Sequence, residues 1–330
     1  MTSTAGSSPR PGSARPGAVA RLAADRGAVC ALAALLLIVL ACALAPLYAA
    51  RISNTDPFRS NPNGTLLLDG RSVEVVQENT AGLGLGTTPL GPTWRGTYLL
   101  GADAQGRDVA ARVLYGGRNS LLIAACATAL CLTLAAVAGI AAGFAGGVAD
   151  TVLAWLLDLL WAFPVTLLAI SLSLVLLSHG VRLGPVLIES DSLALPILIL
   201  GIVYVPYAAR PLRAQVRALR GTEFVLAAVS LGAGPWRVLG RHVLPHVIPT
   251  LVGFVPVIMA LALLSEAALS VLSVGVQAPA ASWGTLIADG QALLYSRPLV
   301  AVMPGLAVVA TVLALNVLAD GLRDVLDPRA

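Results

Sequence analysis

Long uncharged apolar stretches constrain the fold of this chain more than any other feature of its sequence. Hydrophobic residues make up 57% of the 330 residues, and Asp, Glu, Lys and Arg together only 12%. A helical run of about 18 or more apolar residues matches a hydrocarbon core roughly 30 Å thick, and about six such runs occur. Because backbone polar groups must be satisfied internally in lipid, we expect an all-α integral membrane protein. The runs lie at 28–50, 119–143, 152–177, 192–209, 247–273 and 299–319.

The two ends of the chain differ from these runs in composition. Residues 1–27 are rich in Ser, Pro, Gly, Ala and Arg. Such a segment buries too little apolar surface to offset its ordering entropy, so it is predicted to be a disordered cytoplasmic tail. The run at 28–50 is longer than the apolar region of about 7–15 residues in a secretory signal, which favours an uncleaved first span. Residues 321–330 are predicted to form a short cytoplasmic tail.

A polar segment, 51–118, separates the first span from the rest. Within it, residues 65–76 place two β-prone runs around an Asp-Gly turn, which is typical of a β-hairpin. An isolated hairpin is marginally stable in water, so we expect it to pack on other loops or on a partner. Residues 106–118 are compatible with a short amphipathic helix on the membrane surface, with Val109 on its apolar side. The remainder, 119–320, is the predicted transmembrane core.

Arginine bias predicts the orientation in the membrane. All 21 basic residues are arginine. The loop at 210–241 carries six of them, and the loops near 178–191 and 274–298 carry one each, so 210–241 is predicted to be cytoplasmic. Counting spans then puts both termini inside and 51–118 outside. That outer segment holds seven arginines, but six acidic residues accompany them and long segments follow the rule poorly.

The absence of lysine also excludes one site. A Walker A loop uses lysine to reach nucleotide phosphates, so any ATP hydrolysis must come from another subunit. No motif for covalent catalysis is evident either, and we expect a transport subunit without enzyme activity or cofactor.

The polar stretch at 210–249 combines a helix-prone piece, a Gly-rich bend and a second basic piece. Ala227 and Ala228 leave a small surface that another protein can approach closely. Gly232 and Gly234 interrupt the helix and turn the chain. The alternative is an ordinary cytoplasmic loop that its arginines anchor to anionic lipid.

The run from Glu223 to Ala233, followed by Arg-His-x-Leu-Pro at 241–245, resembles the EAA coupling loop of ABC importer permeases. The resemblance implies that the loop at 210–246 docks a separate ATPase. Leu226 stands where the family has a glutamate, and Val229 stands where an arginine is common. The implied coupling residues are Glu223, Ala227, Ala228, Leu231, Gly232, Ala233, Arg237, Arg241, His242 and Pro245.

Residues 101–108, followed by Arg112 and the stretch 115–121, resemble the GTDxxGRD segment of the peptide and nickel permeases, in particular the C subunits of dipeptide and oligopeptide importers. Together with matches near the C-terminus, the likeness covers roughly residues 97–328, and the hairpin region looks like an insertion. It implies the type I permease fold of ABC importers. The motif residues are Asp103, Gly106, Arg107 and Asp108.

The same resemblance implies the partners of the chain. These are a second homologous permease, two ATPase subunits, an extracytoplasmic solute-binding protein and the lipid bilayer, with no nucleic acid. Di- or oligopeptides are the expected cargo, and nickel or another small solute is the alternative.

Two acidic residues, Asp158 and Glu266, lie at or inside apolar runs. An unpaired charge at a bilayer centre costs at least about 2.5–3.5 kcal/mol, which makes each a functional candidate. The competing interpretation is that they lie near helix ends and pair with loop arginines. It is favoured for Asp158 and left open for Glu266. A carrier driven by an ion gradient, the second hypothesis, needs several such groups along a path.

A metal site is not expected. His242 and His246 are four residues apart, but Pro245 disrupts the turn between them and no third ligand is evident. The four cysteines all lie in apolar runs, where they are expected to pack as small apolar side chains.

Overall fold

The protein is a helical bundle with small two-stranded sheets attached. The computed structural model describes residues 18–68, 70–78, 86–179, 181–183, 186–189 and 191–326. The α-helices are α1 (Ala18–Ala24), α2 (Arg26–Ala43), α3 (Ala45–Tyr48), α4 (Val109–Ala145), α5 (Gly147–Trp161), α6 (Val165–His179), α7 (Ala194–Val203), α8 (Val205–Arg220), α9 (Glu223–Ser230), α10 (Pro235–Val238), α11 (Leu244–Val271), α12 (Trp283–Gln291) and α13 (Leu299–Leu326), with π-helical turns at η1 (Ala49–Ser53) and η2 (Leu239–Val243). The strands are β1 (Thr65–Leu68), β2 (Arg71–Glu74), β3 (Val76–Glu78), β4 (Thr87–Pro89), β5 (Val181–Leu183) and β6 (Val186–Ile188).

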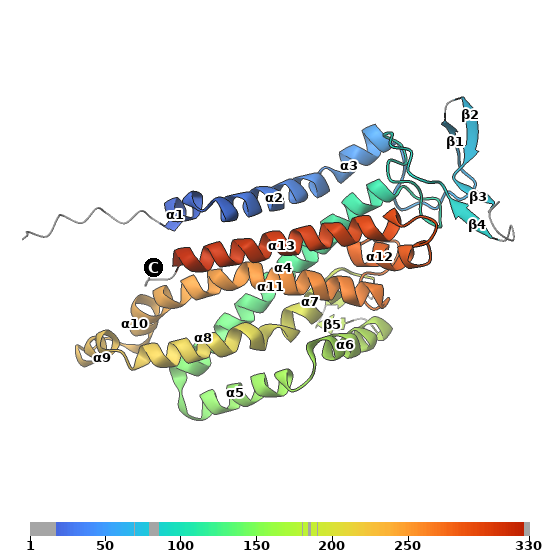
Figure 1. Cartoon of the computed structure of the whole chain (residues 1–330). Coiled ribbons are helices and arrows are strands. Elements are labelled where there is room, and N and C mark those ends of the chain that lie inside the picture. The colour runs from blue at the N-terminus through green and yellow to red at the C-terminus, as the bar shows by residue number, and fades with distance from the viewer. Residues whose placement is uncertain are drawn as a thin grey trace, which may run out of the picture.

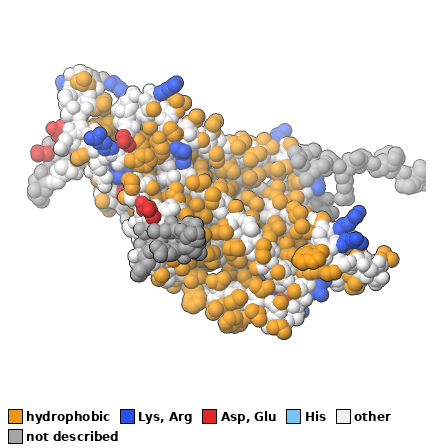
Figure 2. Space-filling model, turned by 180° about the vertical axis from the view of Figure 1, so that it is seen from behind, with side chains coloured by type: hydrophobic (Ala, Val, Ile, Leu, Met, Phe, Trp, Pro, Cys, Tyr) orange, Lys and Arg blue, Asp and Glu red, His pale blue; other side chains and the backbone are white. Residues whose placement is uncertain are grey.

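The long helices run side by side, and the bundle has two distinct ends (Figure 1). Strands β1–β4 and helix α12 lie at one end, which we call the strand end. Helices α1, α9 and α10 and the C-terminal end of α13 lie at the other, which we call the α9 end. Hydrophobic side chains cover the middle of the face in Figure 2, and charged side chains gather toward the two ends. Such a belt is expected of a bundle whose middle faces lipid.

The prediction of about six spans is confirmed. Within the described residues, five helical stretches are long and apolar enough to cross a membrane, and a bent pair of helices brings the number to six when it is counted as one span. The five stretches are Arg26–Ala43, Val109–Ala145, Ala194–Arg220, Pro235–Val271 and Leu299–Leu326.

The sequence predicted one continuous span at 152–177, and this prediction is wrong. The segment is divided between helices α5 and α6, whose axes are bent by 87° relative to each other. Helix α5 ends at Trp161 and α6 begins at Val165, directly after Pro164. Proline disfavours the helical region for the residue before it, here Phe163, so a helix boundary is expected at this point.

The predicted surface helix at 106–118 is also wrong. Residues 109–118 are the first turns of α4, which continues without interruption to Ala145. Asp108 starts this helix, because its Oδ1 accepts a hydrogen bond from the Ala111 N–H at 3.1 Å. Val109 is 0% exposed and Arg112 is 2% exposed, so this segment is buried in protein.

Both predicted tails are partly helical. Residues 1–17 and 327–330 lie outside the described residues. In the N-terminal segment, α1 covers Ala18–Ala24, whose alanine-rich sequence has high helix propensity. At the other end, α13 continues to Leu326, through most of the segment predicted as a tail.

The predicted hairpin is confirmed, and it packs on its own loop. Strands β1 and β2 are antiparallel, with Leu68 opposite Arg71. Of the Asp-Gly turn, Asp69 lies outside the described residues, and Gly70 has φ +80°. Val75 is 1% exposed in a small core with Leu90, Tyr98 and Ala102. Two more antiparallel pairs, β3 with β4 and β5 with β6, complete the described strands.

Helices α4 and α8 approach closely through two glycines. A Cβ atom added at Gly139 would lie 2.8 Å from the carbonyl oxygen of Ala209. One added at Gly143 would lie 2.7 Å from the carbonyl oxygen of Arg213 and 2.9 Å from Cβ of Val216. The small residues therefore allow the two backbones to touch, as in other small-residue helix contacts.

This contact predicts opposite effects for the same substitution at two helical glycines. Alanine in a helix is favoured over glycine by about 0.5–1 kcal/mol, but overpacking costs roughly 1–3 kcal/mol. Gly143→Ala should therefore lower the melting temperature of the detergent-solubilised protein. Gly253→Ala is the matched control, because open space surrounds Gly253 in α11, and it should leave the melting temperature unchanged or raise it. Equal melting temperatures for the two variants would contradict the proposed packing.

Candidate functional site

The predicted loop at 210–246 is mostly helical. Helix α8 continues to Arg220, so Arg210, Arg213 and Arg217 lie on a helix and not in a loop. The chain then turns at Gly221 and Thr222 into α9. The predicted coupling residues lie on α9, on the bend after it, on α10 and η2, and at the start of α11, at one end of the molecule (Figure 1).

Gly232 ends α9 in a conformation that glycine favours. Its φ is +83°, in the left-handed region. The N–H of Ala233 donates to the Ala228 carbonyl at 3.0 Å, and the N–H of Gly232 donates to the Val229 carbonyl at 2.9 Å. These two bonds form a Schellman motif, which satisfies carbonyls that the helix end leaves free. The sharp end of α9 therefore depends on Gly232.

An aromatic contact holds α9 against α11. The ring of Phe224 stacks on His246 with 5.3 Å between centroids and lies 6.4 Å from the ring of His242. The Gln215 amide donates to the carbonyl of His246 at 2.8 Å, which adds a tie to α8. The rings of both histidines thus pack against Phe224. The described residues contain no group of three or more potential metal ligands.

The outer side of α9 and its bend is apolar. Leu226 and Val229 are each 53% exposed, Leu231 is 88% exposed and Trp236 is 83% exposed. We call these four residues the α9 surface. Val225, on the inner side, is 2% exposed. Of the predicted coupling residues, Glu223, Ala227, Leu231, Gly232, Arg237, Arg241 and Pro245 are exposed, and Ala228, Ala233 and His242 are half-buried.

Two arginines of α8 pair with aspartates of α5. Arg210 contacts Asp158 at 2.6 Å. Asp158 therefore has an arginine partner, as the interpretation favoured for it predicted. Arg213 makes two hydrogen bonds to Asp150, which sequence analysis did not single out, one of them at 2.9 Å. These arginines therefore join α5 to α8.

Glu266 has a different environment. Its side chain is 0% exposed, and its oxygens accept hydrogen bonds from Ser120 and Ser270, each at 2.8 Å. The predicted alternative, pairing with a loop arginine, is not what the structure shows. Ser120 also accepts a hydrogen bond from the Trp283 N–H at 3.0 Å. Glu266 thus connects α11 with α4 and the start of α12.

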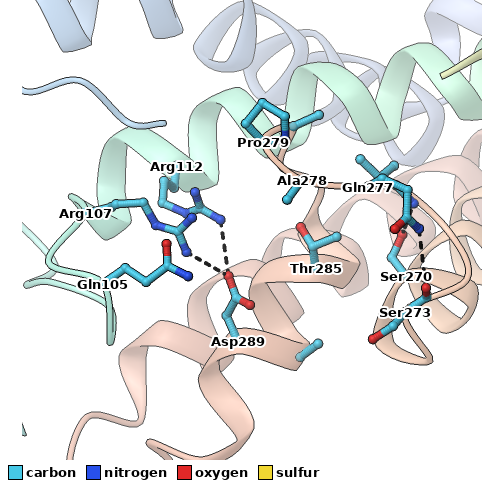
Figure 3. A pocket seen from close by; sticks show the side chains of 13 residues that line it. Gln105, Arg107, Arg112, Ser270, Ser273, Gln277, Ala278, Pro279, Thr285 and Asp289 are labelled. Carbon is cyan, nitrogen blue, oxygen red and sulfur yellow. Dashed lines mark hydrogen bonds and ion pairs between the residues drawn. The ribbon is translucent and has the colours of Figure 1, made fainter. Parts of the chain in front are cut away.

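At the strand end, the residues of the second motif form an ion-pair cluster. Arg107 Nε contacts Asp103 at 2.7 Å, and Arg112 Nε lies 3.4 Å from the same oxygen. Both guanidinium groups also contact Oδ2 of Asp289 on α12, at 3.1 and 3.2 Å (Figure 3). Residues almost 190 positions apart therefore meet in one cluster.

Asp108 has a separate role beside this cluster. Its Oδ1 caps α4, and its Oδ2 accepts hydrogen bonds from Ser53 at 2.5 Å and from the Tyr98 N–H at 3.0 Å. The Tyr98 hydroxyl donates to the Gly106 carbonyl at 2.9 Å. Burial, together with the charge of Asp108, raises the pKa of Tyr98, so this donor stays protonated near neutral pH. The motif therefore fixes the polar segment to the first turn of α4.

Comparison with known proteins identifies the family. Residues 135–330 match the family model of the binding-protein-dependent transport system inner membrane component. The chain belongs to this family.

Curated relatives extend the match toward the N-terminus. A protein of Brucella suis biovar 1 (strain 1330), provisionally named a peptide transport system permease, is 40% identical over 232 residues, which cover 70% of this chain and 74% of that protein. The glutathione transport system permease protein of Pectobacterium atrosepticum is 33% identical over 232 residues, 70% of this chain and 73% of that one. The dipeptide transport system permease protein of Alkalihalophilus pseudofirmus is 33% identical over 232 residues, with 70% and 72% covered.

Sequence reasoning about this inner membrane component missed three residues of its polar clusters as site candidates. Arg112 was noted only as part of a motif, and Asp150 and Asp289 were not singled out. Asp150 directly precedes the predicted span at 152–177, and a charge at the edge of a span was the signal that could have found it. Asp289 falls in the stretch 274–298 that was predicted as a loop, where one more aspartate gives no signal until α12 (Trp283–Gln291) is placed beside α4.

The close packing at Gly106 predicts a further pair of stability effects. Gly106 and Gly86 both have positive φ, +74° and +86°, so alanine at either is strained by about 1–2 kcal/mol. A Cβ atom at Gly106 would also lie 2.4 Å from the carbonyl oxygen of Asn61, whereas open space surrounds Gly86. Gly106→Ala should lower the melting temperature clearly more than Gly86→Ala does. Similar melting temperatures would show that the motif is not packed as described.

Proposed function

We propose that the chain is a permease subunit of a binding-protein-dependent ABC importer that forms half of the translocation path for di- or oligopeptides. A second homologous permease would form the other half. Two ATPase subunits and an extracytoplasmic solute-binding protein would complete the assembly. The family match and the α9 surface support this proposal together.

The α9 surface is the observation that carries the coupling role. Helix α9 is short, its end is fixed by Gly232, and it follows α8 in the chain. The apolar side chains of the α9 surface are exposed. Leu226 and Val229 stand where the resembling loops carry charged residues, so we infer that contact with the ATPase here is mainly apolar. Burial of such side chains is worth roughly 25 cal/mol for each Å² removed from water.

We place the α9 end on the cytoplasmic side. The arginine bias of 210–241 favours this orientation. Helix α1 and the C-terminal end of α13 lie at the same end of the bundle as α9, so both would then face the cytoplasm (Figure 1). The strand end, with its hairpin, would meet the binding protein outside the cell.

The peptide cargo rests on the relatives. Their names include peptide, dipeptide and glutathione transport, and glutathione is itself a small peptide. Nickel or another small solute is the alternative cargo, and a panel of peptides and metals tested on the cognate binding protein separates them.

A carrier driven by an ion gradient has less support. Asp158 is paired with Arg210, and Glu266 is bonded to two serines, so the two candidate charges have structural partners. Co-purification of the chain with a stoichiometric ATPase would favour the importer. Proton-driven transport by the isolated chain would favour the carrier.

The coupling role predicts that Gly232→Pro blocks uptake. Proline fixes φ near −65°, which is incompatible with the φ of +83° at this position, so the end of α9 must rearrange. Uptake of a labelled dipeptide by cells should fall at least tenfold (about 1.4 kcal/mol), while the amount of protein in the membrane stays the same. Deletion of 227–232 should have the same effect.

Gly234→Ala is the control, because Gly234 has φ −66° and open space around it. It should retain uptake. Normal uptake by the Gly232→Pro variant would reject the coupling role of α9.

A further inference from the structure

A cavity of about 220 Å³ lies at the strand end beside the arginine–aspartate cluster. It is open on one side and is lined by residues at and just before the start of α4, by α12 and by the segment at 273–280 that follows α11 (Figure 3). Arg107, Arg112 and Asp289 form one side. Gln277 and Thr285 are among the polar residues that line the rest. Two deeply buried cationic groups therefore border a space that can hold a small solute.

The two aspartates of the cluster are held very differently. Asp103 is 1% exposed, and its Oδ1 accepts hydrogen bonds from the backbone N–H groups of Gln105 and Arg107, both at 2.9 Å. The side chain of Asp289 is 41% exposed, and the contacts recorded for it among the described residues all involve Oδ2. Asp103 is therefore fixed by the backbone, whereas the Asp289 carboxylate is partly in water and meets the arginines through one oxygen only.

Departure of Asp289 would leave a charge that needs a partner. The side chains of Arg107 and Arg112 are 9% and 3% exposed, so both guanidinium groups are almost fully removed from water. Asp103 alone would then balance two cations. A buried charge without a partner is strongly unfavourable, so an anion would be drawn to the vacated position. Arginine binds carboxylates in particular, because its fork of N–H donors matches two oxygens.

We propose that this cavity binds the free carboxylate of a peptide solute, which replaces Asp289 as the shared partner of Arg107 and Arg112. The proposal rests on the peptide-importer function above. A small solute fits better than an acidic side chain of a docked protein, since the guanidinium groups lie nearly covered at the cavity wall. At roughly 30 Å³ per water molecule, the cavity has room for the carboxylate end of a chain.

The decisive variant is Asp289→Asn, which removes the competing charge and keeps the size of the side chain. The full chain is reconstituted in lipid nanodiscs, and binding of radiolabelled alanyl-alanine is measured by equilibrium dialysis. Asp289→Asn should bind the dipeptide about tenfold more tightly than the wild type, and the C-terminal amide of the dipeptide should show no such gain. Loss of a side chain that merely stabilised the fold would not tighten binding.

Asp320→Asn is the matched control, because Asp320 is an exposed aspartate of α13 at the α9 end, 3.9 Å from Arg323. It should bind like the wild type. Arg112→Gln should abolish the dipeptide affinity, with the melting temperature as the check on folding. Where Arg112→Gln fails to fold, the comparison of Asp289→Asn with Asp320→Asn decides.

Equal dipeptide affinity for Asp289→Asn and Asp320→Asn would overturn the proposal, and so would equal affinity for the dipeptide and its amide. A change in docking of the binding protein without a change in dipeptide affinity would also overturn it, by assigning the cluster to a protein interface. The titration requires no ATPase and no binding protein. Its failure is therefore distinct from failure of the importer function, which the Gly232→Pro uptake experiment and ATPase co-purification test.

Discussion

The contact between α4 and α8 connects the two ends of the molecule. Helix α4 has 37 residues, and at 1.5 Å per residue it is about 55 Å long, well beyond the roughly 30 Å of a hydrocarbon core. Its first turn is fixed at the strand end by Asp108. Near its C-terminal end, Gly139 and Gly143 lie directly against α8, which leads into α9. A displacement of α9 can therefore reach the strand end through two packed, rigid helices.

The arginines of this chain have different roles because they differ in burial. Arg107 and Arg112 are covered, and removing one partner from such a pair typically costs about 3–5 kcal/mol. Arg210 and its partner Asp158 are 37% and 65% exposed, and exposed pairs contribute about 0–1 kcal/mol. The first pair of arginines is thus suited to bind a replaceable anion. Arg210 instead joins α8 to α5 through Asp158.

The sequence predicted the number of spans and the hairpin, because both depend on local composition and turn chemistry. It predicted a loop from Arg210, but α8 continues to Arg220, since its charged residues lie on one side of a helix whose other side is buried at Leu212 and Val216. The cluster of Arg112 with Asp289 could not be predicted, because it depends on how α12 packs on α4. Local patterns do not specify contacts between residues almost 180 positions apart.

The buried carboxylate of Glu266 links the cavity at the strand end to helix α4 through two serines. Ser270, which donates to Glu266, also lines the cavity beside Arg112, and its hydroxyl accepts a hydrogen bond from the Val276 N–H at 3.1 Å. On its other side, Glu266 accepts a hydrogen bond from Ser120 of α4. A buried carboxylate is costly unless it is hydrogen-bonded, so these serines must keep their positions relative to one another. The cavity wall and α4 are thereby joined through the side chain of Glu266. A solute that moves the segment after α11 would therefore act on α4 as well.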